Sequence, residues 1–245
     1  MNSVVAMPSP APIIIDHAAP IVVPDSVSDL TLVVASPELI PGLWDEYLDG
    51  ARAAYSARGV EEALQYEDIR DGTGTRVFCA VIDAADRVVG GLRVQGPYTQ
   101  ARESHAVSEW EGQRGQAELI AAIGRRIPSG LIEVKSAFID AASHDAAAGA
   151  GLLARTPLIL MAATGTTHML ATAADYVLAR WESGGGRVDS AIPFTPYPDD
   201  RYRTQAMFWD QQTLAGFAEP EVWAAMCAEF ASAGGLVERE SADVA

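Results

Sequence analysis

Two residues of opposite charge stand close together in a strand-like run near the middle of the chain. The run LIEVKSAFID is rich in β-branched and aromatic residues, which predicts a strand, and it contains Glu133 and Lys135. Side chains alternate along a strand, so these two point to the same face of a sheet. Lys135 is also the only lysine of the chain. Such a pair can belong to a functional site or be a solvated pair of charges, and the sequence favours neither interpretation.

Glycines after this run suggest a second kind of chemistry. Gly149 and Gly151 lie in the small-residue stretch AASHDAAAGAG, and each can adopt a positive φ or let a ligand approach the backbone. A strand, a glycine-rich loop and a helix in this order can present unpaired N–H groups to an anionic cofactor. Thr156 and Pro157 predict a helix start, or restart, because Thr caps helices and Pro suits the first position. A helix beginning at Ala146 would instead contain Pro157 and kink there.

Residues that could bind a metal are few and do not have the spacing of a metal site. His105 and Glu109 would share one face of a helix, but this pair is no recognised metal signature and favours a capping or surface role. Glu109 and Glu111 remain candidates for a base near a site. The two cysteines, Cys79 and Cys227, fit neither a disulfide framework nor a zinc spacing, and we expect buried free thiols. We therefore predict no metal.

Length and composition restrict the class of protein. The chain has 245 residues, of which 49% are hydrophobic and 20% charged, enough for one large or two small globular domains. A net charge of −16 argues against binding to nucleic acid or to an anionic membrane surface. No apolar run is long enough to span a membrane. The first Lys or Arg is Arg52, so the apolar residues 13–15 lack the basic flank of a secretory signal, and we expect a cytoplasmic protein.

The remaining elements follow from hydrophobic patterns and turn residues. Five prolines exclude a regular helix near the start, so residues 1–28 are expected to form a flexible N-terminal arm. Further strands are expected at residues 30–35, 76–82, 88–95, 188–193 and 202–209, and helices at residues 39–51, 60–66, 117–127 and 219–233. The last helix should end at Gly234 and Gly235, which leaves residues 236–245 as a frayed acidic tail.

This order of elements resembles the GNAT (Gcn5-related N-acetyltransferase) fold over residues 30–210. Three pieces carry the resemblance: VVGGLRVQGPY, LIEVKSAFID and THMLATAADYVLARWESGGGRV look like the third strand, the fourth strand, and the fifth strand with its following helix. The nearest relatives would be acyl-homoserine-lactone synthases and N-acyl amino acid synthases. The resemblance implies an α/β (α+β) fold, with a mixed, mostly antiparallel central sheet flanked by helices. Residues 29–235 would form a single domain.

The resemblance also implies a site in a splay between the fourth and fifth strands. An acyl thioester would lie there, its carbonyl held by backbone N–H groups and its pyrophosphate by the loop 149–151 and the helix start after it. The cofactor-binding residues implied are Ala137, Phe138, Ile139, Gly149, Gly151 and Arg155. Glu133 matches an early Glu of the fourth strand and could position the amine or accept its proton. The donor would be acyl-CoA or an acyl-carrier protein, used as a co-substrate with no tightly bound cofactor, and the oligomeric state stays open.

Two departures from the family pattern keep a second function in view. The polar first residue of the family's pyrophosphate loop is Ala146 here, and Trp181 stands where many members carry a tyrosine acid. Tyr176 or Tyr197 could replace that tyrosine. The resemblance implies an acyltransferase that moves an acyl group from an acyl thioester to a small-molecule amine. The alternative is a non-catalytic GNAT-like ligand-binding or regulatory protein. An unrelated enzyme is a third possibility, but the chain contains no recognised motif of another enzyme class.

Overall fold

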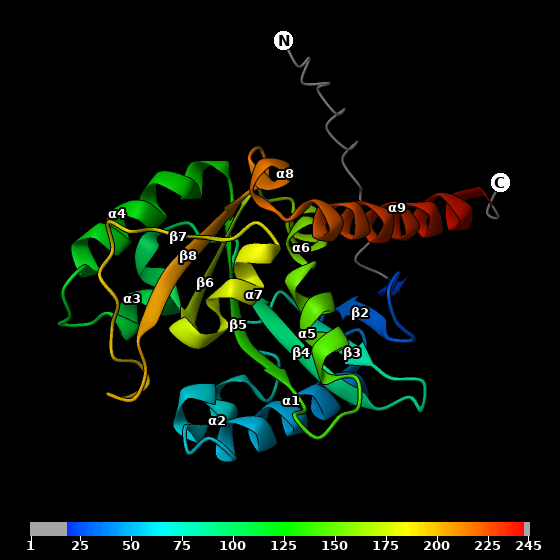
Figure 1. Ribbon diagram of the computed structural model, residues 1–245, viewed down its shortest axis with the longest axis horizontal. Helices are drawn as coiled ribbons and strands as arrows, with labels where there is room; N and C mark the ends of the chain where they lie inside the picture. Colours follow the sequence, from blue (N-terminus) through cyan, green and yellow to red (C-terminus); the bar gives the residue numbers. More distant parts are fainter. Residues whose placement is uncertain (1–18, 243–245) are drawn as a thin grey trace, which may run out of the picture.

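The computed structural model describes residues 19–242, with side chains to residue 233. Residues 1–18 of the expected arm and residues 243–245 of the expected tail lie outside the described residues. The described residues form an eight-stranded sheet in the order β1-β2-β3-β4-β5-β6-β8-β7 (Figure 1). Its strands are β1 (Ile21–Pro24), β2 (Thr31–Ala35), β3 (Val77–Ile82), β4 (Val88–Gln95), β5 (Leu131–Ile139), β6 (His168–Ala174), β7 (Arg187–Val188) and β8 (Thr204–Asp210).

All neighbouring strands run antiparallel except β5 and β6, which are parallel. The mixed, mostly antiparallel sheet predicted from the sequence is thereby confirmed. The α-helices are α1 (Pro41–Ser56), α2 (Tyr66–Ile69), α3 (His105–Glu109), α4 (Gln116–Arg126), α5 (Ala146–Ala154), α6 (Pro157–Thr164), α7 (Leu178–Ser183), α8 (Leu214–Phe217) and α9 (Pro220–Ala242). Short 3-10 helices lie at Glu61–Leu64, Ala101–Glu103, Ile127–Ser129 and Asp175–Val177.

The helices cover the two faces of the sheet unequally. On one face, α1 packs over one apolar cluster and α3 and α4 pack over a separate one. On the other face α5, α6 and α9 share one large apolar cluster with the sheet. Because side chains alternate along β5, Leu131 joins the α3 and α4 cluster while Ile132 joins the opposite one. Glu133 and Lys135 therefore fall on the face of α1 and α3, between its two apolar clusters.

An extra residue in β5 changes which way its second half faces. Arg93 pairs with Lys135 and Gly91 with Phe138, so two residues of β5 oppose one residue of β4. This is a β-bulge, and Ser136 within it adopts a left-handed φ of 52°. The bulge turns the Phe138 ring onto α1, where a Cβ at Gly50 would lie 2.5 Å from that ring. Pairing between β5 and β6 stops at Val134 and Ala171, so the two strands separate beyond that point.

The ends of the chain differ from the expectation. Residues 21–24 were expected in a flexible arm, yet they form edge strand β1, because Ile21 and Val23 alternate inward and are buried against the apolar cluster of α9. Helix α9 was expected to stop at Gly234 and Gly235, but it continues to Ala242. Glycine costs a helix only about 1 kcal/mol each, so a glycine pair does not have to end it.

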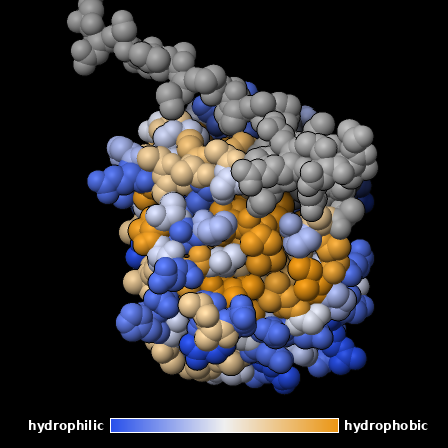
Figure 2. Space-filling model, turned by 90° about the vertical axis from the view of Figure 1, so that its right-hand side faces the viewer, coloured by the Kyte–Doolittle hydropathy of each residue, from blue (hydrophilic) through white to orange (hydrophobic). Residues whose placement is uncertain are grey.

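The expected glycine-rich loop is also wrong, since Gly149 and Gly151 lie inside helix α5. The helix starts at Ala146 and a second one restarts at Pro157, which confirms the predicted restart. Among the described residues no single helix is long and apolar enough to span a membrane, and α5 with α6, bent by 48°, passes that test only as a pair. Figure 2 shows apolar residues gathered on the side of the molecule where α5 lies in Figure 1.

Candidate active site

A cavity of about 790 Å³ opens where β5 and β6 separate. Side chains reach it from both faces of the sheet, so it has two chemically different halves. The apolar half, on the face of α5, is lined by Val134, Ile139, Leu153, Ala171, Ala173, Val177 and Trp181. The polar half, on the face of α1 and α3, is lined by Tyr55, Arg58, Glu109, Lys135, Thr172 and Tyr197. The edge of β5 at residues 137–139 lies along this cavity.

Glu133 lies beside the cavity but does not line it. Its side chain is fully buried and accepts hydrogen bonds from the Tyr98 hydroxyl at 2.7 Å and the Ser104 hydroxyl at 2.8 Å. The backbone N–H groups of His105 and Ala106 also donate to it, each at 3.0 Å. Three of these donors bind Oε2 and one binds Oε1. Glu133 thus caps the first turn of α3, whose N–H groups have no partner within the helix.

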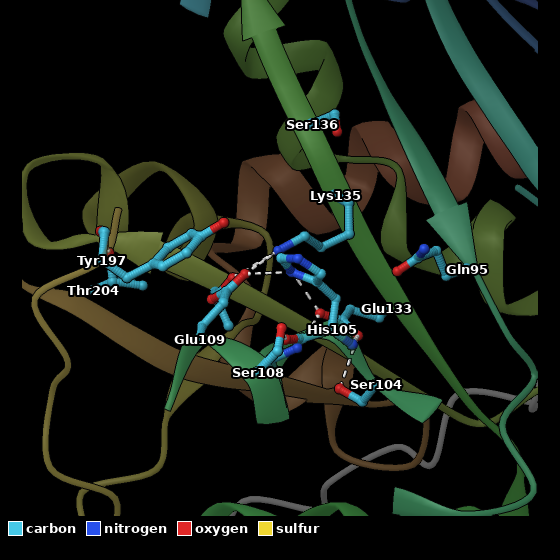
Figure 3. A network of polar contacts seen from close by, with 12 residues as sticks. Gln95, Ser104, His105, Ser108, Glu109, Glu133, Lys135, Ser136, Tyr197 and Thr204 are labelled. Carbon is cyan, nitrogen blue, oxygen red and sulfur yellow. Dashed lines mark hydrogen bonds and ion pairs between the residues drawn. The ribbon is translucent and has the colours of Figure 1, made fainter. Parts of the chain in front are cut away.

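Glu109, at the end of α3, forms an ion pair with Lys135 that the sequence did not predict. The Lys135 ammonium contacts Glu109 Oε1, and His105 Nδ1 lies 3.0 Å from the same oxygen (Figure 3). Lys135 Nζ is also 3.4 Å from the Thr172 hydroxyl and 3.9 Å from Glu133 Oε1. The solvated charge pair considered from the sequence is therefore wrong, because the side chain of Lys135 is only 10% exposed and those of both glutamates are 0% exposed.

The electrostatics of this pair keep both groups charged. Burial alone would raise the pKa of Glu109, but the charges and hydrogen bonds of Lys135 and His105 outweigh it and lower that pKa to about 2. Burial alone would lower the pKa of Lys135. The negative charges of Glu109 and Glu133 outweigh this effect and raise that pKa. Near neutral pH the cavity wall therefore carries a fixed ion pair, and Lys135 offers no lone pair for attack or proton removal.

The same residues could suggest a metal site, because His105, Glu109 and Glu133 place ligand atoms within 4.8 Å of one another. The surrounding groups do not fit that reading. The Lys135 ammonium lies against Glu109 and 3.9 Å from Glu133, which places a positive charge where a cation would bind. Glu133 already accepts four hydrogen bonds from the protein. The charges and donors around these three residues therefore do not fit a metal ion.

Tyrosines surround the polar half of the cavity. Tyr176, expected as a proton donor, lines the cavity, is 66% exposed and lies 6.5 Å from the ring of Tyr202. Tyr197 is more buried, and this burial raises its pKa to about 12 although Lys135 opposes the rise. Trp181 lines the apolar half and packs edge-on against Trp209, with ring centroids 6.0 Å apart.

The expected cofactor residues on α5 occupy two different environments. A Cβ at Gly151 would lie 3.5 Å from Arg155 Nη1 and 3.9 Å from Arg180 Nη1, while Gly149 packs on Ile139. Arg155 does not line the cavity. It is buried, with Nε donating to Glu229 Oε1 at 2.7 Å and Nη2 contacting Asp25.

Sequence reasoning missed three features of the site: the capping of α3 by Glu133, the partner of Lys135, and the position of Arg93. Arg93 on β4 is buried beside Lys135, and its Nε donates to the Ser136 hydroxyl at 3.2 Å. Glu109 was named as a possible base from its place in the chain alone. The available signal was the pairing of a lone lysine with a helical His and Glu four residues apart.

Comparison with solved structures identifies the fold of the chain. The chain is similar to FeeM, an N-acyl amino acid synthase from uncultured soil microbes, with 12% identity, a TM-score of 0.56, and coverage of 77% of this chain and 94% of that one. It is also similar to the AHL synthase LasI, with 14% identity, a TM-score of 0.52, and coverage of 78% and 98%. The protein therefore has a GNAT-like fold, as the sequence predicted.

Comparison of the sequence defines the family more narrowly. No protein-family model matches the chain. Over 198 residues it is 44% identical to the uncharacterized proteins Rv1356c of Mycobacterium tuberculosis and Mb1391c of Mycobacterium bovis, covering 81% of this chain and 75% of theirs. The chain belongs to the same family as these mycobacterial proteins.

Proposed function

We propose that the protein is an acyltransferase that moves an acyl group from an acyl thioester to the amine of a small molecule. The observation that carries this proposal is the cavity at the separation of β5 and β6, which is apolar on one face of the sheet and polar on the other. A thioester needs an apolar wall for its acyl chain, and an amine needs polar partners. The cavity offers both on either side of one backbone edge.

The apolar half would hold the donor. Its apolar wall suits an acyl chain longer than acetyl, and the β5 edge at residues 137–139 would provide backbone donors for the developing oxyanion. The N-terminus of α5 would face the phosphates of the donor, but its N-cap residue is Asp145, whose carboxylate repels an anion. Arg180 of helix α7 lines the cavity and could offer a positive charge to the donor. We therefore propose either acyl-CoA or an acyl-carrier protein as the donor.

In the proposed reaction the amine nitrogen attacks the thioester carbonyl carbon, an amide bond forms and the carbon–sulfur bond breaks. The nitrogen loses one proton and the departing thiolate gains one. Tyr176 lines the cavity and is the proposed proton donor to sulfur. Glu133 stays the predicted proton acceptor, although in this structure it reaches the cavity only through Lys135. The likeness to FeeM favours an amino acid as the amine, and we propose the cytoplasm as the place of action.

A titration with acyl thioesters tests the donor half of this proposal. Saturation at 100 times the dissociation constant adds about 2.7 kcal/mol of stability, which raises the melting temperature by roughly 5 to 10 °C in a domain of this size. We expect a shift with acyl-CoA that grows with the length of the acyl chain. If CoA, acetyl-CoA and long-chain acyl-CoA all leave the melting temperature unchanged, CoA is not the donor and an acyl-carrier protein takes its place in the next titration.

A non-catalytic binding protein is the second candidate. Trp181 supports it, since this side chain stands at the cavity where many members of the fold carry a tyrosine acid and its ring cannot supply a phenolic proton. Such a protein would bind acyl thioesters and show the same thermal shift. It would release no thiol when an amine is added, so turnover separates the two candidates.

A further inference from the structure

Glu109 carries a polar atom whose bonding is incomplete. Its side chain is 0% exposed, and one oxygen, Oε1, is held by Lys135 and His105. The other, Oε2, is buried and has no hydrogen-bond partner among the described residues. A buried acceptor without a donor is costly and rare in folded proteins. In this case the residue also lines the polar half of the cavity, so a ligand bound there could supply the missing donor.

The carboxylate of Glu109 is held in place from three directions. The contacts of Lys135 and His105 fix Oε1, and the two backbone N–H groups that donate to Glu133 fix the first turn of the helix that carries Glu109. Figure 3 shows the carboxylate between the Lys135 ammonium and the ring of Tyr197. A preorganised acceptor of this kind loses little entropy when a donor arrives.

The groups around Oε2 indicate what kind of donor would fit. The charged and titratable groups that face Glu109 are Lys135, His105, Glu133, Tyr55 and Tyr197. The rings of Tyr55 and Tyr197 line the same half of the cavity. Aromatic rings and a carboxylate together attract a positively polarised N–H group. A carboxylate or phosphate would instead be repelled by Glu109, so the acceptor oxygen selects for a ligand that donates.

We propose that Glu109 anchors the amine substrate, with an N–H of a primary amine donating a hydrogen bond to Oε2 while Tyr55 and Tyr197 flank it. This inference rests on the acyltransferase function proposed above and assigns the acceptor side of that site. Glu109 binds the amine and does not remove its proton. The ion pair with Lys135 keeps the carboxylate ionised, which suits a fixed anchor better than a base.

Binding of four probes to the intact protein tests the anchor without any acyl donor. The probes are n-propylamine, tyramine, and the N,N,N-trimethyl derivative of each, which keeps the positive charge and has no N–H. We expect calorimetry to show saturable binding of at least one primary amine to the wild-type protein and no binding of its trimethyl derivative. Glu109→Gln should lower the affinity for the amine by about 10- to 100-fold, because a charge-assisted hydrogen bond is lost. Glu111→Gln, which removes an exposed carboxylate two residues away, should leave that affinity unchanged.

Several results would overturn the anchor. They are equal affinity in Glu109→Gln and Glu111→Gln, equal affinity for an amine and its trimethyl derivative, or no binding of either primary amine to the wild type. If Glu109→Gln does not fold, the double variant Glu109→Gln/Lys135→Met, which leaves no unpaired charge in this pair, is used for the same comparison.

A kinetic measurement separates the anchor from the function on which it rests. In Glu109→Gln the KM for the amine should rise while the pH–rate profile keeps its position. Amine binding that depends on Glu109, in a protein that never transfers an acyl group, would uphold the anchor and end the proposed function. Acyl transfer with an unchanged KM for the amine in Glu109→Gln would uphold the acyltransferase function and end the anchor.

Discussion

Two buried ion clusters have the same charges but different tasks. Each joins one cation to two carboxylates: Lys135 with Glu109 and Glu133, and Arg155 with Asp25 and Glu229. The first cluster lies at the cavity, between α3 and the sheet. The second connects the segment after β1 to helix α9 and does not line the cavity. A cation with two buried carboxylates is therefore no sign of a site unless one of its atoms is left for a ligand.

The two clusters also hold their protons differently. Glu109 receives both Lys135 and His105, and its pKa falls to about 2. Burial raises the pKa of Glu229 to about 7, since the guanidinium of Arg155 only partly offsets the loss of solvation. The cluster at the cavity is thus fixed in its charge near neutral pH, whereas the cluster beneath α9 titrates there. Four experiments can break this comparison or make it sharper.

The largest effect is expected from Lys135→Met. This change leaves Glu109 buried without its main partner, which should cost about 3 to 5 kcal/mol of unfolding free energy. Urea denaturation measures it. The double variant Lys135→Met/Glu109→Gln should recover much of the loss. A single variant as stable as the wild type would show that the pair is not buried in solution.

Arg155→Met is the matched control for Lys135→Met. It also leaves two buried carboxylates without their cation, so it too should destabilise the fold. Its effect on ligands should differ, because Arg155 does not line the cavity. In folded protein we expect unchanged thioester affinity. A loss of affinity in Arg155→Met would restore Arg155 to the cofactor-binding residues that the sequence implied.

A smaller effect is expected from Glu133→Gln. An amide offers one acceptor oxygen to the four donors that now bind the carboxylate, so the variant should lose about 1 to 3 kcal/mol of stability. If Glu133 accepts the amine proton, as proposed, the folded variant should also lose turnover and the acid limb of its pH–rate profile should be displaced. A profile that keeps its position would rule out Glu133 as the base.

The smallest effect is the pH dependence contributed by Glu229. Its pKa is higher in the folded state, at about 7, than in the unfolded chain, so the folded state binds the proton more tightly. Stability from this group is full below the unfolded pKa and falls as pH rises toward 7. The free energy of unfolding should therefore decline between pH 5 and pH 8 by an amount of order 1 kcal/mol, and Glu229→Gln should flatten that decline. An equal slope in both proteins would assign the titration to another group.

The strands were the easiest part of the fold to predict. The hairpin of β3 and β4 and the run that became β5 have short alternating or β-branched patterns that local sequence determines. Helix α5 was missed because Gly149 and Gly151 favour a loop locally, and packing of small residues against the sheet overrode that preference. The bulge at Ser136 has no signal in the sequence, although it sets the direction of Phe138.

The site was harder to predict because its contacts are not local. Glu109 and Lys135 are 26 positions apart, and Glu133 caps a helix that begins 28 positions earlier in the chain. Arg155 finds its partners 130 and 74 positions away. A sequence does not indicate which charged residues will pair when they lie this far apart in the chain. The general location of the cavity, by contrast, followed from the family resemblance.

The central claim is that this cavity joins an acyl thioester to an amine. The most direct test is mass spectrometry of the protein incubated with octanoyl-CoA, or with octanoyl acyl-carrier protein, and a mixture of amino acids and simple primary amines. Our account predicts an N-octanoyl product of one or more of these amines, formed by the wild type and much more slowly by Glu109→Gln. If no acylated amine forms with either donor, although the thioester binds, the protein is not an acyltransferase for such amines and the binding-protein alternative holds.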